Sequence, residues 1–258
     1  MNVVVCVKQI PDPANPGQLA PDTHTLVRDD KLVIDDADAY GVELGLQLAD
    51  AAGGEVTVVS MAPHEETSGL RSALAMGAAR AILVSDALLA GSDALSTAKV
   101  LAAAIRRAEP DLVIAATEST DGYTGTLPVQ LAELLGFPSV SFVKRLAATD
   151  GALRADRQTE SGYDEVQVTL PAVVTVTAGA VEPRYPSFKG IMAAKRKEIE
   201  QINLADLDID PATVGFAGSR QEVLSVVAAP PRQAGEIVVD EGDAHERITA
   251  FLEQLKVI

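Results

Sequence analysis

The stretch Val3-Val4-Val5-Cys6-Val7 decides the fold. An unbroken apolar run that is mostly valine is typical of a strand covered on both faces, because a strand with one solvated face alternates polar and apolar residues. Lys8 and Pro11 end the run at once, so we expect no signal peptide here. A chain that begins with such a strand usually begins in the middle of a parallel sheet. We therefore expect the later strands to flank this one on both sides.

Short apolar runs and helical patterns alternate along the first half of the chain. The helical patterns begin at acidic or capping residues and stop at glycines such as Gly53 and Gly77. This order predicts parallel strands joined by right-handed crossovers, a doubly wound, mostly parallel Rossmann-like α/β sheet. The expected strands are Glu55–Ser60, Arg80–Val84 and Asp111–Ala116, and the expected helices run from Asp38 to Ala52, from Glu65 to Met76 and from Asp93 to Ala108.

The sequence changes character after Pro138. Val140–Leu146 reads as another strand. Leu153–Thr159 and Glu165–Leu170 alternate polar and apolar residues, as antiparallel strands with one solvated face do. A buried strand over Ala172–Thr177 follows. The sheet is therefore expected to carry mixed strands near one edge.

Two further segments stand apart from this pattern. Thr25–Ile34 reads as a small hairpin with Asp29-Asp30 at its turn. From Asn203 onward the chain has little periodicity until Ala244–Leu255, which predicts an amphipathic helix. An arm of this kind cannot build its own core, so we expect it to pack on another surface. The predicted division is an α/β domain over residues 1–202 and an extended C-terminal arm with a helix over residues 203–258.

Composition narrows the class of protein. Hydrophobic residues make up 47% of the 258 residues, which is enough for a large globular core. The net charge of −16 argues against nucleic acid as a partner, because phosphate backbones repel acidic proteins. The single cysteine, Cys6, allows no disulfide within the chain and favours a cytoplasmic location. No apolar run reaches about 18 residues, so direct insertion into a membrane is not expected.

The loop Thr117–Thr126 is the most informative of those that follow the predicted strands. Ligands of doubly wound sheets bind at the carboxyl ends of the strands, near the point where the strand order reverses. This loop follows a buried strand, precedes a helix and combines hydroxyls with Gly122 and Gly125. Amides and hydroxyls in that position hydrogen-bond an anion, which favours a phosphate site for a mononucleotide over an ordinary Thr/Gly turn. The loop matches neither Gly-x-x-x-x-Gly-Lys-Ser/Thr nor Gly-x-Gly-x-x-Gly.

Groups for catalysis are sparse. The three histidines, His24, His64 and His245, lie in polar stretches, and their spacing suggests neither a metal cluster nor a Ser-His pair. Asp35, Asp36 and Asp38 are better explained as acidic residues at a helix start than as a cation site. The Thr117–Thr126 loop holds no Lys or Arg for phosphoryl transfer. The sequence therefore predicts a nucleotide-binding protein that is not itself an enzyme and holds no metal.

The stretch from Val181 to Lys197 is the best candidate for a contact surface. Pro183 and Pro186 end the preceding strand because neither can donate a ladder hydrogen bond. Phe188, Ile191 and Met192 follow at the spacing of one helix face. One interpretation is a loop and helix that cap a core strand. The other is a docking element that holds an aromatic residue and an arginine out to a partner.

Three segments resemble the small, beta subunit of the electron transfer flavoproteins, also called FixA-like proteins. The first is Val3–Asp12, and the second is Arg71–Ala78, which is similar to an Ala-Leu-Ala-Met-Gly-Ala helix end of that family. The third and most specific is Glu182-Pro183-Arg184-Tyr185-Pro186, continuing through Ile191-Met192-Ala193-Ala194-Lys195. The resemblance extends over the full chain in order and length.

This resemblance implies an electron carrier. Members of the family pair with a larger alpha subunit that holds most of a FAD, while the beta subunit lends one wall of that site and buries an AMP without a redox role. The pair takes electrons from acyl-CoA and related dehydrogenases, as in fatty acid oxidation. It passes them to a membrane quinone oxidoreductase. The arm over residues 203–258 is then expected to pack on the alpha subunit.

The resemblance also assigns residues. The docking loop for dehydrogenases falls on Arg184, Tyr185, Phe188, Ile191 and Met192, with Phe188 at the anchoring position. The AMP site falls on Cys6, Asp35, Asp36, Ala37, Asp38, Met61, Ala116, Thr117, Ser119, Thr120, Asp121, Gly122, Tyr123, Thr124, Gly125 and Thr126.

Two alternatives remain open at this stage. Electron-bifurcating relatives bind a second FAD where other members bind AMP. A stand-alone adenine-nucleotide sensor of the universal-stress type would also use the loop Ser119–Thr126, although that class has no need of the long arm.

Overall fold

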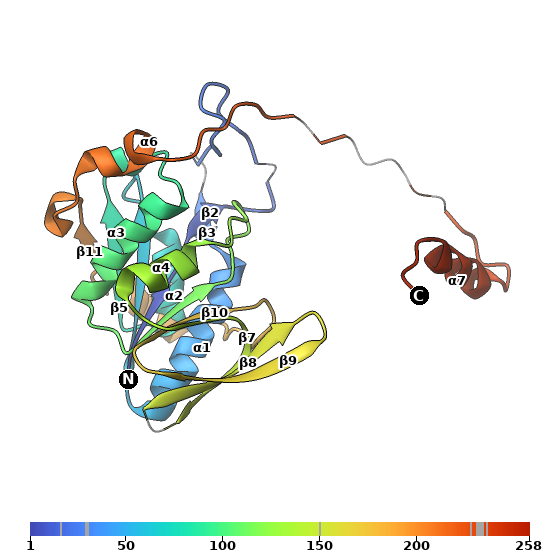
Figure 1. Ribbon diagram of the computed structural model, residues 1–258, viewed down its shortest axis with the longest axis horizontal. Helices are drawn as coiled ribbons and strands as arrows, with labels where there is room; N and C mark the ends of the chain where they lie inside the picture. The colour runs from blue at the N-terminus through green and yellow to red at the C-terminus, as the bar shows by residue number, and fades with distance from the viewer. Residues whose placement is uncertain (16, 29–30, 150, 228, 231–234, 236) are drawn as a thin grey trace. The chain divides into compact units, whose positions relative to one another are not determined.

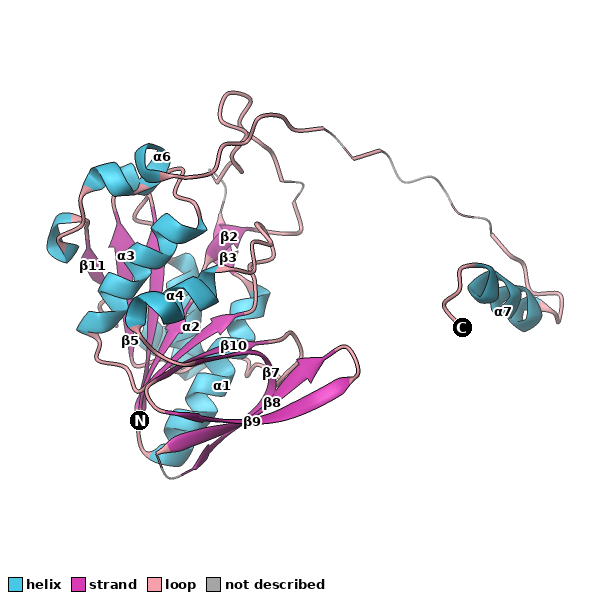
Figure 2. Ribbon diagram, viewed as in Figure 1, coloured by secondary structure: helices cyan, strands magenta, loops and turns pink. Residues whose placement is uncertain are grey.

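The computed structural model describes residues 1–258 except 16, 29–30, 150, 228, 231–234 and 236. The chain divides into two compact units, Met1–Val223 and Leu224–Ile258. The first unit is a layered α/β domain, and the described residues of the second include one helix (Figures 1 and 2).

A mostly parallel sheet forms the centre of the first unit. In the described residues it has nine strands in the order β11-β5-β4-β1-β6-β10-β7-β8-β9. Strands β11 through β7 run parallel, and β7, β8 and β9 are antiparallel. The predicted Rossmann-like α/β fold is confirmed, and so are the predicted antiparallel strands at one edge of the sheet. The strands are β1 Asn2–Cys6, β4 Glu55–Ala62, β5 Arg80–Ser85, β6 Leu112–Ala116, β7 Ser139–Thr149, β8 Ala152–Thr159, β9 Gly162–Thr169, β10 Ala172–Val176 and β11 Glu200–Ile202.

Strand β1 lies inside the sheet, as its apolar sequence predicts. Val3 pairs in register with Val56 of β4 on one side and with Leu112 of β6 on the other. Successive side chains of β1 enter two different cores: Val3 and Val5 join one, and Val4 and Cys6 join the other. Each face of the strand is therefore sealed by apolar side chains.

Helices cover both faces of the sheet (Figure 2). Helices α1 (Asp36–Ala52) and α2 (Ser68–Met76) contribute to the core that contains Val3. Helices α3 (Ala94–Arg107) and α4 (Leu127–Leu135) contribute to the opposite core. Helix α1 approaches closely because it carries glycine where it faces β1: a Cβ on Gly45 would lie 3.1 Å from a methyl of Val5.

The hairpin expected over Thr25–Ile34 is wrong. Its second half forms β3 (Leu32–Ile34), which pairs antiparallel with β2 (Gln9–Pro11) just after β1. In this arrangement Ile10 and Leu32 are 3% and 7% exposed, and the burial of such apolar side chains stabilises it. The expected turn at Asp29-Asp30 lies outside the described residues.

The boundary between the units falls at Val223, later than the boundary at residue 202 expected from the sequence. Leu204 and Val214 are buried in the core beside α3, so the segment that contains them belongs to the first unit. Its short elements are the 3-10 helices η2 (Ala205–Leu207) and η3 (Pro211–Thr213) and helix α6 (Gly215–Gly218). Two further short elements of this unit are η1 (Ala87–Leu89) and α5 (Phe188–Ala194).

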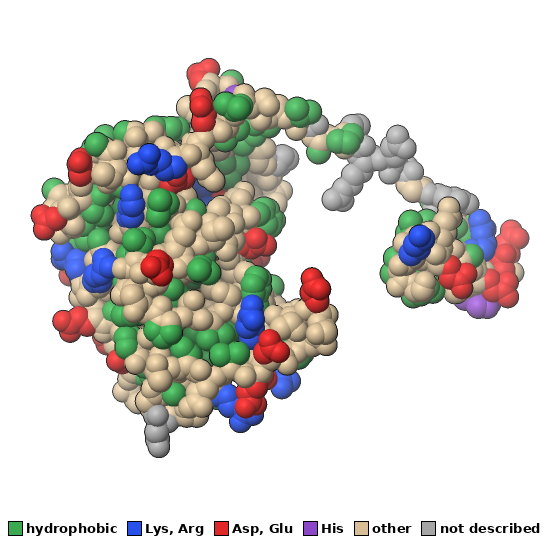
Figure 3. Space-filling model, viewed as in Figure 1, with side chains coloured by type: hydrophobic (Ala, Val, Ile, Leu, Met, Phe, Trp, Pro, Cys, Tyr) green, Lys and Arg blue, Asp and Glu red, His purple; other side chains and the backbone are tan. Residues whose placement is uncertain are grey.

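The second unit contains helix α7 (Ala244–Gln254). The amphipathic pattern predicted this helix, and Ile248, Phe251 and Leu255 of its apolar stripe are more than half exposed. Across the described residues, none of the helices combines the length and the apolar character needed to span a bilayer. On the face of the first unit seen in Figure 3, acidic and basic side chains are interspersed.

Candidate functional site

The candidate site lies where the strand order reverses. From β1 the chain continues to β4 on one side, and it later returns to β6 on the other side. In doubly wound sheets, such a point is where a crevice for ligands lies, at the carboxyl ends of the two strands. The start of α1 and the Thr117–Thr126 loop meet there.

Asp35 joins the start of α1 to the loop after β6. Its carboxylate caps α1 by accepting a 3.0 Å hydrogen bond from the Ala37 backbone N–H. The same carboxylate accepts hydrogen bonds from the backbone N–H and hydroxyl of Thr120, at 2.7 and 3.1 Å. Asp35 is fully buried, so these donors replace its lost hydration. The pairing fixes the position of the loop relative to the helix.

Asp38 lies one helical turn further along α1 and is also buried. It accepts a 2.6 Å hydrogen bond from the backbone N–H of Lys8. Burial raises the pKa of Asp38 to about 8, against the lowering effect of the Lys8 N–H and with a further rise from Asp35. Asp38 is therefore largely protonated at neutral pH.

Cys6 lies at the end of β1, below this site. Burial, and then the proximity of Asp38, raise the pKa of its thiol to about 12. The thiol is therefore protonated and unreactive at neutral pH. The expectation that Cys6 serves as a small buried residue agrees with its 7% exposure.

Asp121 is the centre of a charge cluster. Lys8 Nζ lies 2.6 Å from its Oδ1, and Arg28 Nη2 donates to its Oδ2. Lys8 also donates to the Ser119 hydroxyl at 3.3 Å, and Arg28 donates to the Gln9 carbonyl at 3.0 Å. Burial acts to raise the pKa of Asp121, but Lys8 and Arg28 outweigh it and hold that pKa below its usual range.

Lys8 and Arg28 were missed by sequence reasoning, which noted that the Thr117–Thr126 loop contains no cation. The structure brings both cations to that loop from segments more than 90 residues away in sequence. The signal for Lys8 was its position directly after β1, where a side chain reaches the crevice. Arg28 had no comparable signal, because it lies in a polar stretch with no periodicity.

The other predicted residues gather at the same end of the sheet, with different surroundings. Ala116 ends β6, and Met61 lies near the end of β4. The Thr117 hydroxyl is occupied within the chain, 3.2 Å from the Thr175 hydroxyl and from the Val176 carbonyl. Tyr123 and Gly125 have positive φ values of 48° and 65°. The exposed residues are Asp36, Thr120, Gly122, Tyr123, Thr124, Gly125 and Thr126.

The second candidate surface is the segment around α5. Ser187 caps this helix by accepting a 3.1 Å hydrogen bond from the Gly190 N–H. Tyr185 and Phe188 are 91% and 81% exposed, and Ile191 and Met192 are exposed as well. All four side chains are therefore accessible to another protein.

Arg184 is placed differently from the other residues of this segment. It folds back onto α1, and its Nε lies 2.7 Å from Oε2 of Glu43. The sequence interpretation of an arginine held out to a partner does not describe this contact, since the guanidinium has a partner within the chain.

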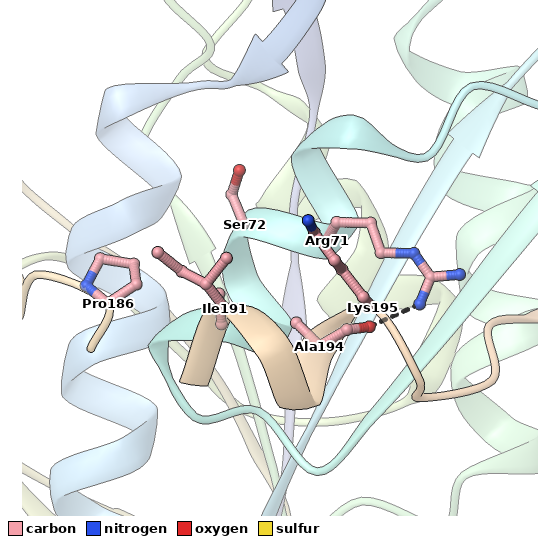
Figure 4. A pocket seen from close by; sticks show the side chains of 7 residues that line it. Arg71, Ser72, Pro186, Ile191, Ala194 and Lys195 are labelled. Atoms are coloured by element: carbon pink, nitrogen blue, oxygen red, sulfur yellow. Dashed lines mark hydrogen bonds between the residues drawn. The ribbon is translucent and has the colours of Figure 1, made fainter. Parts of the chain in front are cut away.

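An open groove of about 510 Å³ lies between α2 and α5. Figure 4 shows Ile191 and Pro186 at one end and Arg71, whose Nη1 donates to the Ala194 carbonyl at 2.7 Å, at the other. Arg71 thus holds the end of α5 against α2. The groove is lined by Arg71, Ser72, Ala75, Pro186, Ile191, Ala194 and Lys195.

Comparisons with known proteins concern the chain as a whole. A family model described as the electron transfer flavoprotein domain matches residues 23–207. The chain is 38% identical to the electron transfer flavoprotein subunit beta of Mycobacterium tuberculosis (strain H37Rv), covering 100% of this chain and 99% of the relative. It is 35% identical to the subunit of the same name from Thermoanaerobacterium thermosaccharolyticum, covering 99% and 98%. It is also 34% identical to the caffeyl-CoA reductase-Etf complex subunit CarD of Acetobacterium woodii, covering 92% of each chain.

The first prediction concerns Asp121. Asp121→Asn removes the charge that Lys8 and Arg28 share, and we expect it to lower the free energy of unfolding by about 1.5–3 kcal/mol, the range for hydrogen bonds to charged groups. The loss stays within this range because Lys8 and Arg28 are partly exposed and keep some hydration. Urea unfolding measures the change, with the exposed Asp22→Asn as control. Equal unfolding free energies for the two variants would contradict the assigned role.

The second prediction concerns Asp38 and pH. Folding raises its pKa from 3.8 to about 8, so the folded chain holds one more proton than the unfolded chain between those values. The contribution of Asp38 to stability is therefore full below about pH 4 and is lost as the pH rises to about 8. Asp38→Asn cannot titrate, so we expect its melting temperature to fall less than that of the unmodified chain from pH 5 to pH 8.

Asp36→Asn is the matched control for this measurement, because Asp36 is exposed in the same helical turn. Thermal unfolding followed by circular dichroism at each pH gives the comparison. If Asp38→Asn and Asp36→Asn show the same pH dependence, the assignment of a protonated Asp38 is wrong.

Proposed function

The chain belongs to the electron transfer flavoprotein family, and from this premise we propose that it is the beta subunit of a heterodimer that carries electrons through FAD. The observation that carries the proposal is the match to beta subunits over essentially the whole of both chains. A stand-alone nucleotide sensor is disfavoured, because the match includes the C-terminal arm.

The proposed partner is the alpha subunit of the same family. Helix α7 supports this partner, since Ile248, Phe251 and Leu255 expose an apolar stripe that its own unit does not cover. Burying such a stripe on a partner removes apolar surface from water. We propose that the arm after Val223 packs on the alpha subunit in this way.

The proposed ligand of the crevice is AMP. Its chemistry fits the residues present, because Lys8, Arg28 and the hydroxyls of Ser119, Thr124 and Thr126 carry donors of the kind that bind phosphate oxygens. The neutral form of Asp38 avoids repulsion of an anion and keeps a proton to donate. Asp35 holds the loop in place through Thr120. The proposed role of the AMP is structural.

The proposed electron path runs outside this crevice. FAD, shared with the alpha subunit, supplies the redox chemistry when bound. The proposed donors are acyl-CoA and related dehydrogenases, as in fatty acid oxidation, and the proposed acceptor is a membrane quinone oxidoreductase. The chain itself is proposed to act in the cytoplasm as a carrier rather than an enzyme. Its contribution is to seat the cofactors and to dock the donors.

One specific observation favours a different ligand for the crevice, a second FAD in place of AMP. The chain is similar to a subunit of a caffeyl-CoA reductase-Etf complex as well as to subunits named only as electron transfer flavoproteins. A second FAD in place of AMP would suit an electron-bifurcating relative. AMP remains the proposal because the closer relatives at 38% identity carry the simpler name.

The experiment that tests the proposal is co-expression with an alpha subunit, followed by mass spectrometry of the small molecules released from the purified complex. We expect a yellow heterodimer that releases FAD and AMP in equal amounts. Release of two FAD and no AMP would replace AMP with the second flavin. A colourless chain that does not bind the alpha subunit would contradict the proposed function altogether.

The third prediction tests the docking surface. Phe188→Ala removes an exposed aromatic side chain, and a buried interface anchor of this kind is worth roughly 2 kcal/mol, which is about 30-fold in affinity. We expect the KM of the donor dehydrogenase for the heterodimer to rise by about that factor, with kcat and the FAD and AMP content unchanged. Steady-state reduction of the heterodimer by the dehydrogenase, at limiting and saturating heterodimer concentrations, measures both constants.

The control for Phe188→Ala is Leu88→Ala. Leu88 is also exposed, at 56%, but it lies in η1 after β5, away from the segment around α5 in sequence. An unchanged KM for Phe188→Ala, or an equal rise for both variants, would remove the docking role from Phe188.

A further inference from the structure

Arg184 and Glu43 form the best-satisfied ion pair near the segment around α5. Glu43 Oε2 accepts from Arg184 Nε at 2.7 Å and from the Arg184 backbone N–H at 3.2 Å. Its Oε1 accepts from Arg184 Nη2 at 3.1 Å and from Gln47 Nε2 at 2.8 Å. One carboxylate therefore binds both the side chain and the main chain of Arg184. A contact to both fixes the backbone as well as the guanidinium.

Glu43 holds this contact from a buried position on α1. Its side chain is 5% exposed in the middle of α1, whereas the side chain of Arg184 is 38% exposed. Burial acts to raise the pKa of Glu43, but Arg184 and Gln47 outweigh it and lower that pKa, so the carboxylate is charged at neutral pH. Asp50 lies 3.6 Å from Arg184 Nη2 but is 72% exposed. Asp50 is therefore a far weaker partner than Glu43.

The pair holds the chain immediately before the exposed aromatic residues. Pro183 and Pro186 restrict the backbone on either side of Arg184 and Tyr185. Tyr185 directly follows the anchored residue, and Phe188 opens α5 three residues later. The start of the exposed segment is thus fixed by Glu43, a residue on a different element.

The other end of the segment is fixed against α2. Gly190 allows a very close approach there, since a Cβ at that position would lie 2.6 Å from the Ala75 carbonyl oxygen. Arg71 donates to the Ala194 carbonyl at 2.7 Å, and Lys197 donates to the Ala78 carbonyl at 2.5 Å. Tyr185 and Phe188 are exposed between two anchored ends. An exposed side chain whose backbone is fixed loses less conformational entropy when a partner binds it.

We propose that Arg184 is a positioning residue, anchored by Glu43, that holds Tyr185 and Phe188 in the arrangement a donor protein recognises without itself touching the donor. This inference rests on the proposed docking function of the segment. It goes beyond that function by assigning Glu43, a residue of α1 outside the segment, to donor recognition. It also assigns Arg184 to positioning Tyr185 and Phe188, in place of the direct contact with the donor that the family resemblance implies.

The test uses the heterodimer with its alpha subunit and three variants of the chain. Glu43→Gln removes the charge but keeps the size of the side chain, and Arg184→Lys keeps the charge but loses the bidentate geometry. Asp50→Asn is the matched control, since it removes the exposed carboxylate near Arg184 on the same helix. We expect Glu43→Gln and Arg184→Lys to raise the KM of the donor dehydrogenase for the heterodimer roughly tenfold. The kcat stays constant, because each change weakens binding of the two proteins equally in the ground state and in the transition state. Asp50→Asn is expected to leave KM unchanged.

A second measurement does not depend on the donor. Cys6 is buried, so Lys189→Cys, exposed in α5, introduces a selectively reactive thiol for a nitroxide spin label. We expect Glu43→Gln to increase the mobility of this label in the electron paramagnetic resonance spectrum, and Asp50→Asn to leave it unchanged. A role limited to stability would lower the melting temperature of Glu43→Gln without changing label mobility or KM at temperatures where the variant is folded.

The outcomes separate the inference from the function on which it rests. Raised KM and raised label mobility in Glu43→Gln, with neither in Asp50→Asn, support the positioning role. If Phe188→Ala raises KM but Glu43→Gln does not, the inference fails and the docking function stands. If neither variant changes KM, the docking function fails and the inference fails with it. Unchanged label mobility in Glu43→Gln overturns the inference whatever the kinetics.

Discussion

The burial of β1 on both faces is the constraint on which the rest of the structure depends. Because Val3 and Val5 face one core while Val4 and Cys6 face the other, β1 must lie inside the sheet with helices on both sides. The chain then has to leave β1 toward β4 and return toward β6, which places the reversal of strand order at the end of β1. The position of the crevice follows from this arrangement. Lys8 lies beside it because it is the first polar residue after the apolar run.

Helix α1 connects the two surfaces that this fold creates. Its capping residue Asp35 holds the loop after β6 through Thr120, and Asp38 binds the main chain that leaves β1. Further along the same helix, Glu43 binds Arg184 at the start of the exposed segment. A helix packed closely on β1 through Gly45 is stiff enough to keep these contacts in a constant relation.

Sequence reasoning predicted the features that depend on local pattern and missed those that depend on distant pairing. Apolar runs and glycine stops predicted the parallel sheet, its order of elements and the position of the Thr117–Thr126 loop. The hairpin over Thr25–Ile34 failed because Leu32–Ile34 pairs with Gln9–Pro11, a strand that precedes it by about 20 residues, rather than with its neighbours in sequence. The partners of Asp121 and Arg184 could not be read from spacing, because a charged residue carries no information about which opposite charge folding brings to it.

These distant pairs also bring two cations to one end of the sheet in a chain with a net charge of −16, which suits the proposed AMP site. Lys8 and Arg28 offset the charge of Asp121, and burial keeps Asp38 in its neutral form at pH 7. This end of the sheet therefore holds two cations among its carboxylates. In the AMP site proposed above, the hydroxyls of the Thr117–Thr126 loop would add to these cations as donors to phosphate oxygens.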